Sequence, residues 1–408
     1  MNFSKQTIRD VPLEHQTVLV RADYNVPLDS KGQIRDDLRI KASLPTLRYL
    51  LEKGCKVVIM SHLGRPSGRE QSYSLEVVGE RLAQLLGRPV HFIDDCKGDR
   101  VSQVVKRAPK TSVVLLENLR FYDEEEANDH AFAKSIAQST GARYFVQDGF
   151  GVVHRAHAST QAITLCLPSV AGLLLENEYT TITRAMNEPK RPFVAVLGGA
   201  KVSDKIGVIE HFVELADTIL IGGAMANTFL AYKDIAVGKS KIETNQGDVL
   251  DALFAAARKK VGDNKVDDFI VLPTDVAVAS TIDASAKRTV RKVEMIAPDD
   301  IALDIGDATI NRFTEIVEAA GTVIWNGPVG YSELAEFAHG SARMAMALAT
   351  HSSVTSIIGG GDTADFVLNW DGQGGKSFSH VSTGGGAGLD LMAGKVLPGI
   401  QSLLDARK

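Results

Sequence analysis

Arginine side chains follow the predicted strands in the first part of the chain. Arg21 comes directly after one apolar run, and Arg65, Arg120 and Arg155 stand shortly after three others. A guanidinium group is a planar fork of donors that pairs bidentately with a carboxylate or a phosphate. One such arginine is more often part of an exposed ion pair. Four of them at the same edge of one sheet favour a binding site for a small anion.

Other polar side chains accompany these arginines. Asp23 and Asn25 follow the same run as Arg21, His62 follows the second run, and Arg39 lies in the first crossover. The set is rich in cations and poor in paired acids, so it is suited to holding an anion rather than to acid–base catalysis.

A pair of histidines raises the alternative of a metal site. His154 and His157 stand three residues apart, with Asp148 nearby. This spacing is common by chance and no complete ligand set accompanies it. Histidines that pack or hydrogen-bond beside an anion are therefore the favoured interpretation.

Glycine takes the corresponding positions in the second part of the chain. Of the 36 glycines, 11 lie in residues 1–188 and 25 in residues 189–408. Glycine-rich turns follow five predicted strands, at residues 198–199, 222–223, 327–330, 359–361 and 384–386. Glycine lets backbone N–H groups approach a phosphate closely, and a following helix N-terminus adds partial positive charge. One such turn is usually just a tight connection, but five indicate a nucleotide site.

Charged side chains stand within or beside these turns. Lys201 and Lys205 lie four residues apart, on one face at the start of a helix, and can place two ammonium groups on a polyphosphate. Asp362 follows a glycine turn, where a carboxylate and phosphate oxygens together suit Mg²⁺. These residues favour a nucleotide with a polyphosphate chain.

Neither common nucleotide-binding loop explains the pattern. The string GxxxxGK[ST] is absent, and Gly359, Gly361 and Ala364 match the dinucleotide fingerprint only in part, because residues 379–386 lack the acid that would bind a ribose hydroxyl. The partial match makes an NAD-linked dehydrogenase one alternative, although the acid that it predicts beyond the loop is missing. A non-catalytic anion-binding protein of the same fold is another, and it predicts lost lysine or arginine positions, whereas all are present.

Short apolar runs alternate with segments of helical periodicity and must position these residues. The runs lie at residues 17–20, 56–60, 90–93, 112–116 and 144–146, then at 193–197, 218–221, 268–272, 322–325, 354–358 and 380–382. Such alternation predicts an α/β fold with parallel sheets covered on both faces. We expect two doubly wound, Rossmann-like domains, at residues 1–172 and 193–394, with ligands beyond the carboxyl ends of the strands. The linker, residues 173–192, is predicted to be a helix over Leu173–Asn187 that ends before Pro189 and Pro192.

Composition excludes several other classes of protein. Hydrophobic residues make up 44% of the 408 and charged residues 23%, so the chain can bury sizeable cores. The net charge of −5 gives no reason to expect a nucleic acid partner. Three distant cysteines without a CxxC pair argue against a disulfide framework or a cysteine zinc site. With no secretory signal and no apolar run that could span a membrane, we expect a cytoplasmic protein.

Taken together, the motifs resemble the phosphoglycerate kinase family. The resemblance rests on the strings RADYNVP, SHLGRP, LLENLRF, HRAHAS, GGAKVSDKI, IWNGPVG, GGGDTA and VSTGGGAGLDLMAGKVLPGI, in this order over residues 21–400. The chain departs from the family pattern at Gln147, Gly149, Ala224, Asn227 and Asp307, none of which we assign to ion binding.

The resemblance implies transfer of the γ-phosphoryl group of ATP to the carboxylate of 3-phosphoglycerate, giving 1,3-bisphosphoglycerate and ADP, and the reverse reaction in glycolysis. It implies that 3-phosphoglycerate is held by Asp23, Asn25, Arg39, His62, Arg65, Arg120 and Arg155. For the nucleotide it implies phosphate contacts from Lys201, Lys205, Gly360, Gly361, Asp362 and Thr363, Mg²⁺ at Asp362, and adenosine beside Gly306, Asn326 and Glu333. It also implies that residues 395–408 pack back on the N-terminal domain.

Catalysis in such an enzyme is alignment plus neutralisation of charge. A carboxylate nucleophile is already ionised at pH 7, so no general base is needed. We expect Arg39 and Lys201 to act as transition-state cations, assisted by backbone amides at Gly360 and Gly384. Because the two substrates bind on different domains, we also expect the chain to close about its hinge before transfer. We further expect a monomer.

Overall fold

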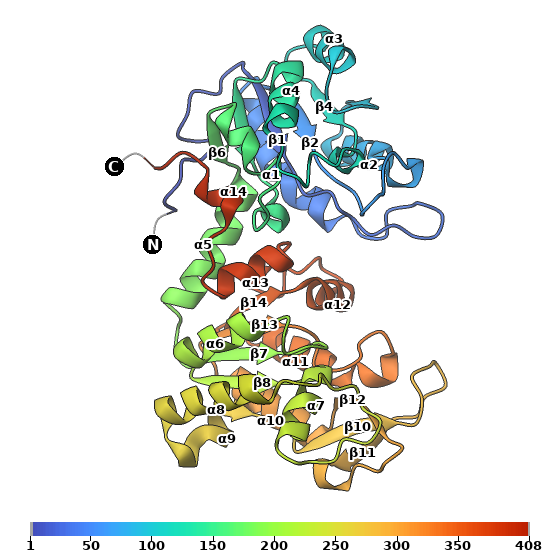
Figure 1. Cartoon of the computed structure of the whole chain (residues 1–408), viewed down its shortest axis with the longest axis vertical. Coiled ribbons are helices and arrows are strands. Elements are labelled where there is room, and N and C mark those ends of the chain that lie inside the picture. Colours follow the sequence, from blue (N-terminus) through green and yellow to red (C-terminus); the bar gives the residue numbers. More distant parts are fainter. Residues whose placement is uncertain (1–2, 407–408) are drawn as a thin grey trace. The chain divides into compact units, whose positions relative to one another are not determined.

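Two six-stranded parallel sheets organise the chain, one in each of two units (Figure 1). The computed structural model describes residues 3–406. The N-terminal unit contains the chain up to Thr180 and the segment from Val396 onward, and the C-terminal unit contains Thr181–Lys395. The division falls inside helix α5 (Leu173–Asn187), so this one helix contributes residues to both units.

The N-terminal sheet has the strand order β3-β4-β2-β1-β5-β6. Its strands are β1 (Thr17–Arg21), β2 (Lys56–Met60), β3 (Val90–Ile93), β4 (Val113–Leu116), β5 (Tyr144–Gln147) and β6 (Ser169–Ala171). Alternate residues such as Val18 and Val20 pack in a core with Leu47 of α1, while the intervening Leu19 is also fully buried. Burial on both faces explains why a central strand such as β4 (VVLL) is a continuous apolar run.

The helices of the N-terminal unit connect these strands. They are α1 (Leu38–Glu52), α2 (Glu76–Leu86), α3 (Asp99–Arg107) and α4 (His130–Thr140). The short helix α14 (Pro398–Gln401) also belongs to this unit but connects no strands of the sheet. In the sheet, β1 has β2 on one side and β5 on the other, so the direction of strand progression reverses between β1 and β5. Ligands of doubly wound sheets bind beyond the carboxyl ends of the strands at such a point.

The C-terminal sheet has the strand order β9-β8-β7-β13-β14-β15. Its strands are β7 (Phe193–Leu197), β8 (Thr218–Ile221), β9 (Ile270–Val271), β13 (Thr322–Asn326), β14 (Thr355–Gly359) and β15 (His380–Val381). Counted along the chain this is the order 3-2-1-4-5-6 of dinucleotide-binding folds, which reverses between β7 and β13. The prediction of two doubly wound parallel sheets is therefore confirmed.

Helices surround the C-terminal sheet as well. They are α6 (Ile206–Leu215), α7 (Gly223–Tyr232), α8 (Gly247–Val261), α9 (Val266–Phe269), α10 (Asp307–Glu318), α11 (His339–Thr350), α12 (Gly361–Asp371) and α13 (Gly386–Met392). Phe313 of α10 and Met344 of α11 pack with Trp325 of β13 in one fully buried core.

Three features of the strands differ from the sequence-based expectation. An antiparallel sheet in the order β11-β10-β12 is added to the C-terminal unit, from β10 (Asp275–Ala279), β11 (Thr289–Lys292) and β12 (Ile301–Ile305). The short strand β6 adds a sixth member to the N-terminal sheet. The run at 268–272 forms only the two-residue β9, because Asp267 and Asp268 lie exposed in the helical turn of α9 rather than in a buried strand.

The C-terminal segment packs within the N-terminal unit. The Gly399 amide donates to the Val153 carbonyl at 2.9 Å, and the Gln6 amide donates to the Leu404 carbonyl at 2.8 Å. The Lys5 ammonium pairs with the Asp405 carboxylate at 2.7 Å. These contacts tie the segment to both the start of the chain and the loop after β5.

Two further observations concern the described residues as a whole. Between residues 3 and 406, no helix has the length and apolar character needed to cross a membrane. Cys55, Cys96 and Cys166 are all free thiols, with Cys55 and Cys96 buried.

Candidate active site

The loop after β1 and the start of α1 place a charged pair at the carboxyl edge of the N-terminal sheet. Arg39 Nη1 lies 3.0 and 3.2 Å from the two carboxylate oxygens of Asp23 and donates to the Asn25 carbonyl at 3.1 Å. Burial would raise the pKa of Asp23, but the positive charge of Arg39, and next that of Arg21, outweighs it and lowers this pKa. Asp23 therefore stays ionised and holds one end of the Arg39 guanidinium.

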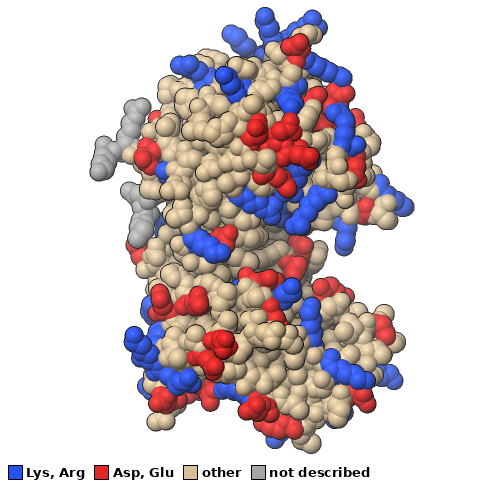
Figure 2. Space-filling model, in the orientation of Figure 1, with Lys and Arg blue, Asp and Glu red and all other residues tan. Residues whose placement is uncertain are grey.

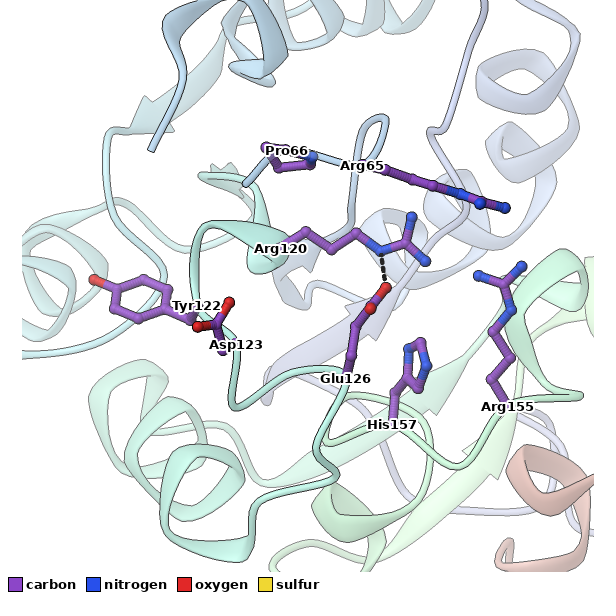
Figure 3. Close-up of a pocket in the computed structure, with 8 residues that line it drawn as sticks. All are labelled: Arg65, Pro66, Arg120, Tyr122, Asp123, Glu126, Arg155 and His157. Carbon is purple, nitrogen blue, oxygen red and sulfur yellow. Dashed lines mark ion pairs between the residues drawn. The ribbon is translucent and has the colours of Figure 1, made fainter. Parts of the chain in front are cut away.

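Three of the predicted arginines line one cavity of about 450 Å³ (Figure 3). Arg65 follows β2, Arg120 lies in the turn after β4, and Arg155 lies in the loop after β5. The complete lining is Arg65, Pro66, Arg120, Tyr122, Asp123, Glu126, Arg155 and His157. The parallel sheet thus brings together side chains that are up to 90 residues apart in the sequence (155 − 65).

The remaining candidates for the acid substrate do not line this cavity but are connected to its rim. Arg120 donates to the Gly64 carbonyl at 2.6 Å, and the Gly64 amide donates to Asn25 Oδ1 at 2.8 Å. His62 is 4% exposed and its Nδ1 lies 3.1 Å from Arg21 Nη2. Asp23, Asn25, Arg39 and His62 therefore form a second group of candidates joined to the arginines through the loop at Gly64.

Acidic side chains also lie in the cavity, and sequence reasoning missed them. Glu126 forms an ion pair with Arg120 Nε at 2.9 Å, drawn as the dashed line in Figure 3, and Asp123 lines the same cavity. Figure 2 shows acidic and basic side chains side by side on this face of the N-terminal unit. The pKa of His157 is lowered to about 4, mainly because the side chain is buried, so its imidazole is neutral at pH 7. The positive charge of the cavity therefore comes from its arginines.

In the C-terminal unit, Lys205 lies beneath the turns that follow β7 and β13. Its ammonium donates to the carbonyls of Gly198 at 2.6 Å and Asn326 at 3.0 Å. Burial lowers the pKa of Lys205 to about 8, against the opposing charges of Asp362 and Asp204. Lys201, the other predicted lysine, is exposed.

The glycines of these turns divide into two kinds. A Cβ on Gly198 would lie 2.0 Å from the Pro328 carbonyl oxygen, so this glycine is required by the packing of two loops. A Cβ on Gly361, the first residue of α12, would meet nothing within 4 Å. Packing explains the first glycine but offers no reason for the second.

A cavity of about 320 Å³ opens beside the same turns. Of the predicted nucleotide residues, it is lined by Glu333 and Asp362, together with Pro328 of the loop after β13. The other lining residues are Gly199, Ala200, Gly223, Ala224, Lys241, Ile282, Ile301, Ala302, Leu303, Gly330 and Tyr331. One side of the cavity is formed by three residues of β12, Ile301, Ala302 and Leu303. Their apolar run in the sequence was the signal that could have predicted this part of the lining.

The other nucleotide candidates lie outside this lining. Thr363 Oγ1 accepts from the Gly327 amide at 2.7 Å, which connects α12 to the loop after Asn326. Gly306 precedes α10, and its amide donates to the Asp275 carbonyl. Gly384 precedes α13, and its amide donates to Ser382 Oγ at 3.0 Å.

Asp362 is the candidate metal ligand. Its carboxylate lies in the first turn of α12, is exposed and lines the cavity of about 320 Å³. Throughout residues 3–406, no group of three or more His, Cys, Asp or Glu side chains is arranged to hold a metal ion. A single carboxylate fits Mg²⁺ that is held jointly with phosphate oxygens and water, which is how this ion is commonly bound.

Comparison with known proteins identifies the family of the chain. The family model described as phosphoglycerate kinase matches residues 8–395. Curated phosphoglycerate kinases from Chloroflexus aurantiacus and Pelotomaculum thermopropionicum are 47% and 44% identical to the chain, covering 99% of it and 100% of each relative.

Solved structures agree as well. The phosphoglycerate kinase structure from Coxiella burnetii aligns with a TM-score of 0.83 at 34% identity, and that from Pyrococcus horikoshii with 0.82 at 32%, each covering 98% of both chains. Sequence and fold therefore match these proteins over nearly the whole length of the chain. The chain belongs to the phosphoglycerate kinase family.

Proposed function

We propose that this kinase transfers the γ-phosphoryl group of ATP to the carboxylate of 3-phosphoglycerate, and catalyses the reverse reaction in glycolysis. The observation that carries the proposal is the separation of two anion sites in a chain of this family. One unit has an arginine-lined cavity suited to a small acid, and the other has a cavity bordered by glycine turns and Asp362.

The acid substrate is assigned to the N-terminal unit. Its phosphate and carboxylate are both anions, and a guanidinium fork binds either group through two hydrogen bonds. The residues assigned to it are Asp23, Asn25, Arg39, His62, Arg65, Arg120 and Arg155. The support for this assignment is the shared cavity of three arginines and the hydrogen-bonded loop that links them to Asn25.

The nucleotide is assigned to the C-terminal unit. Lys201, Lys205, Gly360, Gly361 and Thr363 would contact its phosphates, and Gly306, Asn326 and Glu333 would border its adenosine. Asp362 would hold Mg²⁺, which neutralises charge on the β- and γ-phosphates when bound. Support comes from the position of Asp362 and Glu333 on one cavity and from the open space above Gly361.

The transfer step forms a bond between a carboxylate oxygen and the γ-phosphorus and breaks the bond from that phosphorus to the ADP oxygen. The attacking carboxylate carries no proton at pH 7, so no side chain needs to remove one. Arg39 and Lys201 would stabilise the charge on the transferring group, with amides at Gly360 and Gly384 as further donors. Since the two sets of residues belong to different units, the units must come together for the transfer.

The reaction is tested with ATP, Mg²⁺ and 3-phosphoglycerate by detecting the acyl phosphate product in a coupled assay. Formation of 1,3-bisphosphoglycerate and ADP in equal amounts is expected, and absence of the acyl phosphate would overturn the proposal. Arg39→Ala should lower kcat by orders of magnitude, because a transition-state cation is lost, while the affinity for ATP survives. Arg35→Ala removes an exposed arginine from the loop that precedes α1 and serves as the control, with turnover close to wild type.

We further infer that the enzyme works as a monomer in the cytoplasm. Each candidate site is built from residues of one unit, and the cysteines are free thiols, as expected for a reducing compartment. Light scattering coupled to gel filtration tests the first part, and a mass of two chains at assay concentrations would contradict it. Fractionation of the producing cells tests the second.

A further inference from the structure

A buried cluster of polar side chains lies beneath the rim of the N-terminal site. Arg21 and Glu125 are each 1% exposed, Ser159 is fully buried, and His62 is 4% exposed. Arg21 ends β1, whereas Glu125 and Ser159 lie in the loops after β4 and β5. Burying a guanidinium group is unfavourable unless its donors are satisfied, so the partners of Arg21 indicate what it does.

The three nitrogens of Arg21 have distinct partners. Nε donates to Ser159 Oγ at 2.7 Å, Nη1 donates to the Ala22 carbonyl, and Nη2 lies 3.1 Å from His62 Nδ1. A guanidinium group has donors and no acceptor. The hydrogen bond to the imidazole therefore requires a lone pair on Nδ1, and the ring proton must be on Nε2.

We propose that Arg21 is a positioning residue for the acid substrate, which holds His62 as the neutral tautomer with a proton on Nε2. In this tautomer His62 presents an N–H donor to an anion while adding no charge to a rim that already has Arg39 and Arg120. The inference rests on the proposed role of His62 in binding 3-phosphoglycerate. It extends that proposal by naming the group that sets the imidazole's hydrogen-bonding direction.

Ser159 and Glu125 hold Arg21 in place from the other side. Ser159 Oγ donates to Glu125 Oε1 at 2.6 Å, and the Ser159 amide donates to Oε2 at 3.0 Å. The Ser159 hydroxyl thus accepts from Arg21 and donates to Glu125 at the same time, which uses both of its hydrogen-bonding roles. Glu125 also supplies a buried negative charge near the guanidinium group.

The charges that face His62 agree with a neutral ring. Burial, and next the charge of Arg21, lower the pKa of His62 well below its usual range; Arg120 and Arg39 act in the same direction, and Asp23 opposes them. A protonated imidazole would have N–H groups on both nitrogens, and the one on Nδ1 would face Arg21 Nη2 with no acceptor between them.

Nitrogen-15 NMR of the imidazole groups in the free enzyme tests the tautomer directly. We expect the Nδ1 resonance of His62 at the position of an unprotonated nitrogen and Nε2 at that of a protonated one, with no titration between pH 8 and pH 5.5. A proton on Nδ1, or titration near pH 6.5, would overturn the inference whatever the substrate of the enzyme is.

Ser159→Ala tests the positioning role with little change in volume. Without the serine oxygen, Arg21 loses the acceptor that orients Nε, so we expect the KM for 3-phosphoglycerate to rise about three- to tenfold. The KM for ATP should stay at the wild-type value, and the His62 resonances should move toward a mixture of tautomers. Ser169→Ala is the matched control. Ser169 is another buried serine of the same unit, and among the contacts described its Oγ donates only to the Leu167 carbonyl.

Two further variants separate the inference from the proposed function. Arg21→Lys retains a positive charge but lacks the fork that reaches Ser159 and His62 together, so it should show the same tautomer change. An unchanged His62 spectrum in both Ser159→Ala and Arg21→Lys would overturn the role of Arg21. An unchanged KM for 3-phosphoglycerate in His62→Ala, with the expected tautomer in wild type, would instead remove His62 from the proposed substrate site.

Discussion

The carboxylate of Glu126 is paired with Arg120, which we propose to bind the acid substrate. It forms an ion pair with Arg120 Nε inside the arginine-lined cavity, and its own side chain is 58% exposed. An incoming anion must therefore displace Glu126 or share Arg120 with it. Pairs with this much exposure contribute about 0.2–1 kcal/mol.

Removing this charge should strengthen substrate binding. In Glu126→Gln we expect the KM for 3-phosphoglycerate to fall about 1.4- to fivefold at low salt, which corresponds to that range of energies. Steady-state kinetics at two salt concentrations measure the effect, and high salt should reduce it. Glu124→Gln makes the same change in charge two residues away, where the carboxylate faces Lys97 at 3.8 Å instead, and should change the KM less. Equal effects in the two variants would contradict the prediction.

The run of four acids at residues 123–126 shows where sequence reasoning stops at this scale. In sequence it resembles a solvated acidic stretch. In the structure Asp123 lines the cavity, Glu124 faces Lys97, Glu125 is buried beside Ser159, and Glu126 pairs with Arg120. The irregular path of one loop places neighbouring residues in different environments. The periodicity of the sequence does not predict such a path. The arginines could be predicted because each follows a strand end, whose position the sheet determines.

At the scale of secondary structure, the start of α12 tests the nucleotide assignment. Gly361 has no neighbour that a methyl group would touch, so Gly361→Ala should leave the thermal unfolding temperature unchanged. If the ATP phosphates approach this amide, the added methyl group should raise the KM for ATP about tenfold or more. Differential scanning calorimetry and kinetics measure the two effects.

Two other glycines serve as controls for this prediction. Gly247→Ala changes the first residue of α8, which also has no neighbour within 4 Å, and should alter neither stability nor kinetics. Gly198→Ala should lower stability instead, because its methyl group would overlap the Pro328 carbonyl. A wild-type KM for ATP in Gly361→Ala would remove this amide from the phosphate site.

Asp148 connects the end of β5 to the start of α5. Its Oδ1 accepts from Thr46 Oγ1 at 2.7 Å and from the Leu174 amide at 3.1 Å, while Oδ2 is buried without a hydrogen bond. Burial is the largest effect on its pKa and raises it to about 7, although the hydrogen bonds from Thr46 and from backbone amides oppose the rise.

This raised pKa makes stability depend on pH in a defined direction. The unfolded chain ionises Asp148 near pH 3.9 and the folded chain near pH 7, so the folded state binds the extra proton between these values. The stabilisation is complete below about pH 4 and is lost as the pH rises through 7. We expect about 2–4 kcal/mol of this dependence to vanish in Asp148→Asn, which has no proton to lose.

Urea unfolding followed by circular dichroism at pH 5 and pH 8 measures this dependence. Asp99→Asn, at the exposed first residue of α3, is the control and should retain the wild-type difference between the two pH values. A wild-type difference in Asp148→Asn would show that Asp148 does not take up the proton.

Strands that are buried on both faces could be predicted from the sequence. Strands that are exposed could not. The run at β7 is apolar throughout, and those at β1 and β2 are apolar except at their ends (Thr17, Arg21 and Lys56), because helices cover both sides of the sheet. β11 has the sequence TVRK and is largely exposed, so nothing in its composition marks it as a strand. It exists because β10 provides an edge to pair with, and that edge is a property of the folded unit.

At the scale of the whole chain, the surplus of glycine in residues 189–408 and the series of arginines in residues 1–188 predicted two units with different ligands. The placement of the C-terminal segment in the N-terminal unit was implied only by the family resemblance. The pairing of Gln6 with Leu404 joins segments 398 residues apart (404 − 6), and no local pattern encodes it.

The division of the sites between two units leads to a prediction about the whole molecule. Phosphoryl transfer needs the attacking oxygen about 3–3.5 Å from the phosphorus, and neither unit holds candidate residues for both reactants. We therefore expect the radius of gyration, measured by small-angle X-ray scattering, to fall when 3-phosphoglycerate and a non-hydrolysable ATP analogue with Mg²⁺ bind together. Each ligand alone should cause a smaller change, because it contacts one unit. Arg120→Ala, which impairs the acid site, should respond to both ligands as wild type responds to the nucleotide alone. An unchanged radius in wild type with both sites saturated would contradict closure and require that the reactants meet without it.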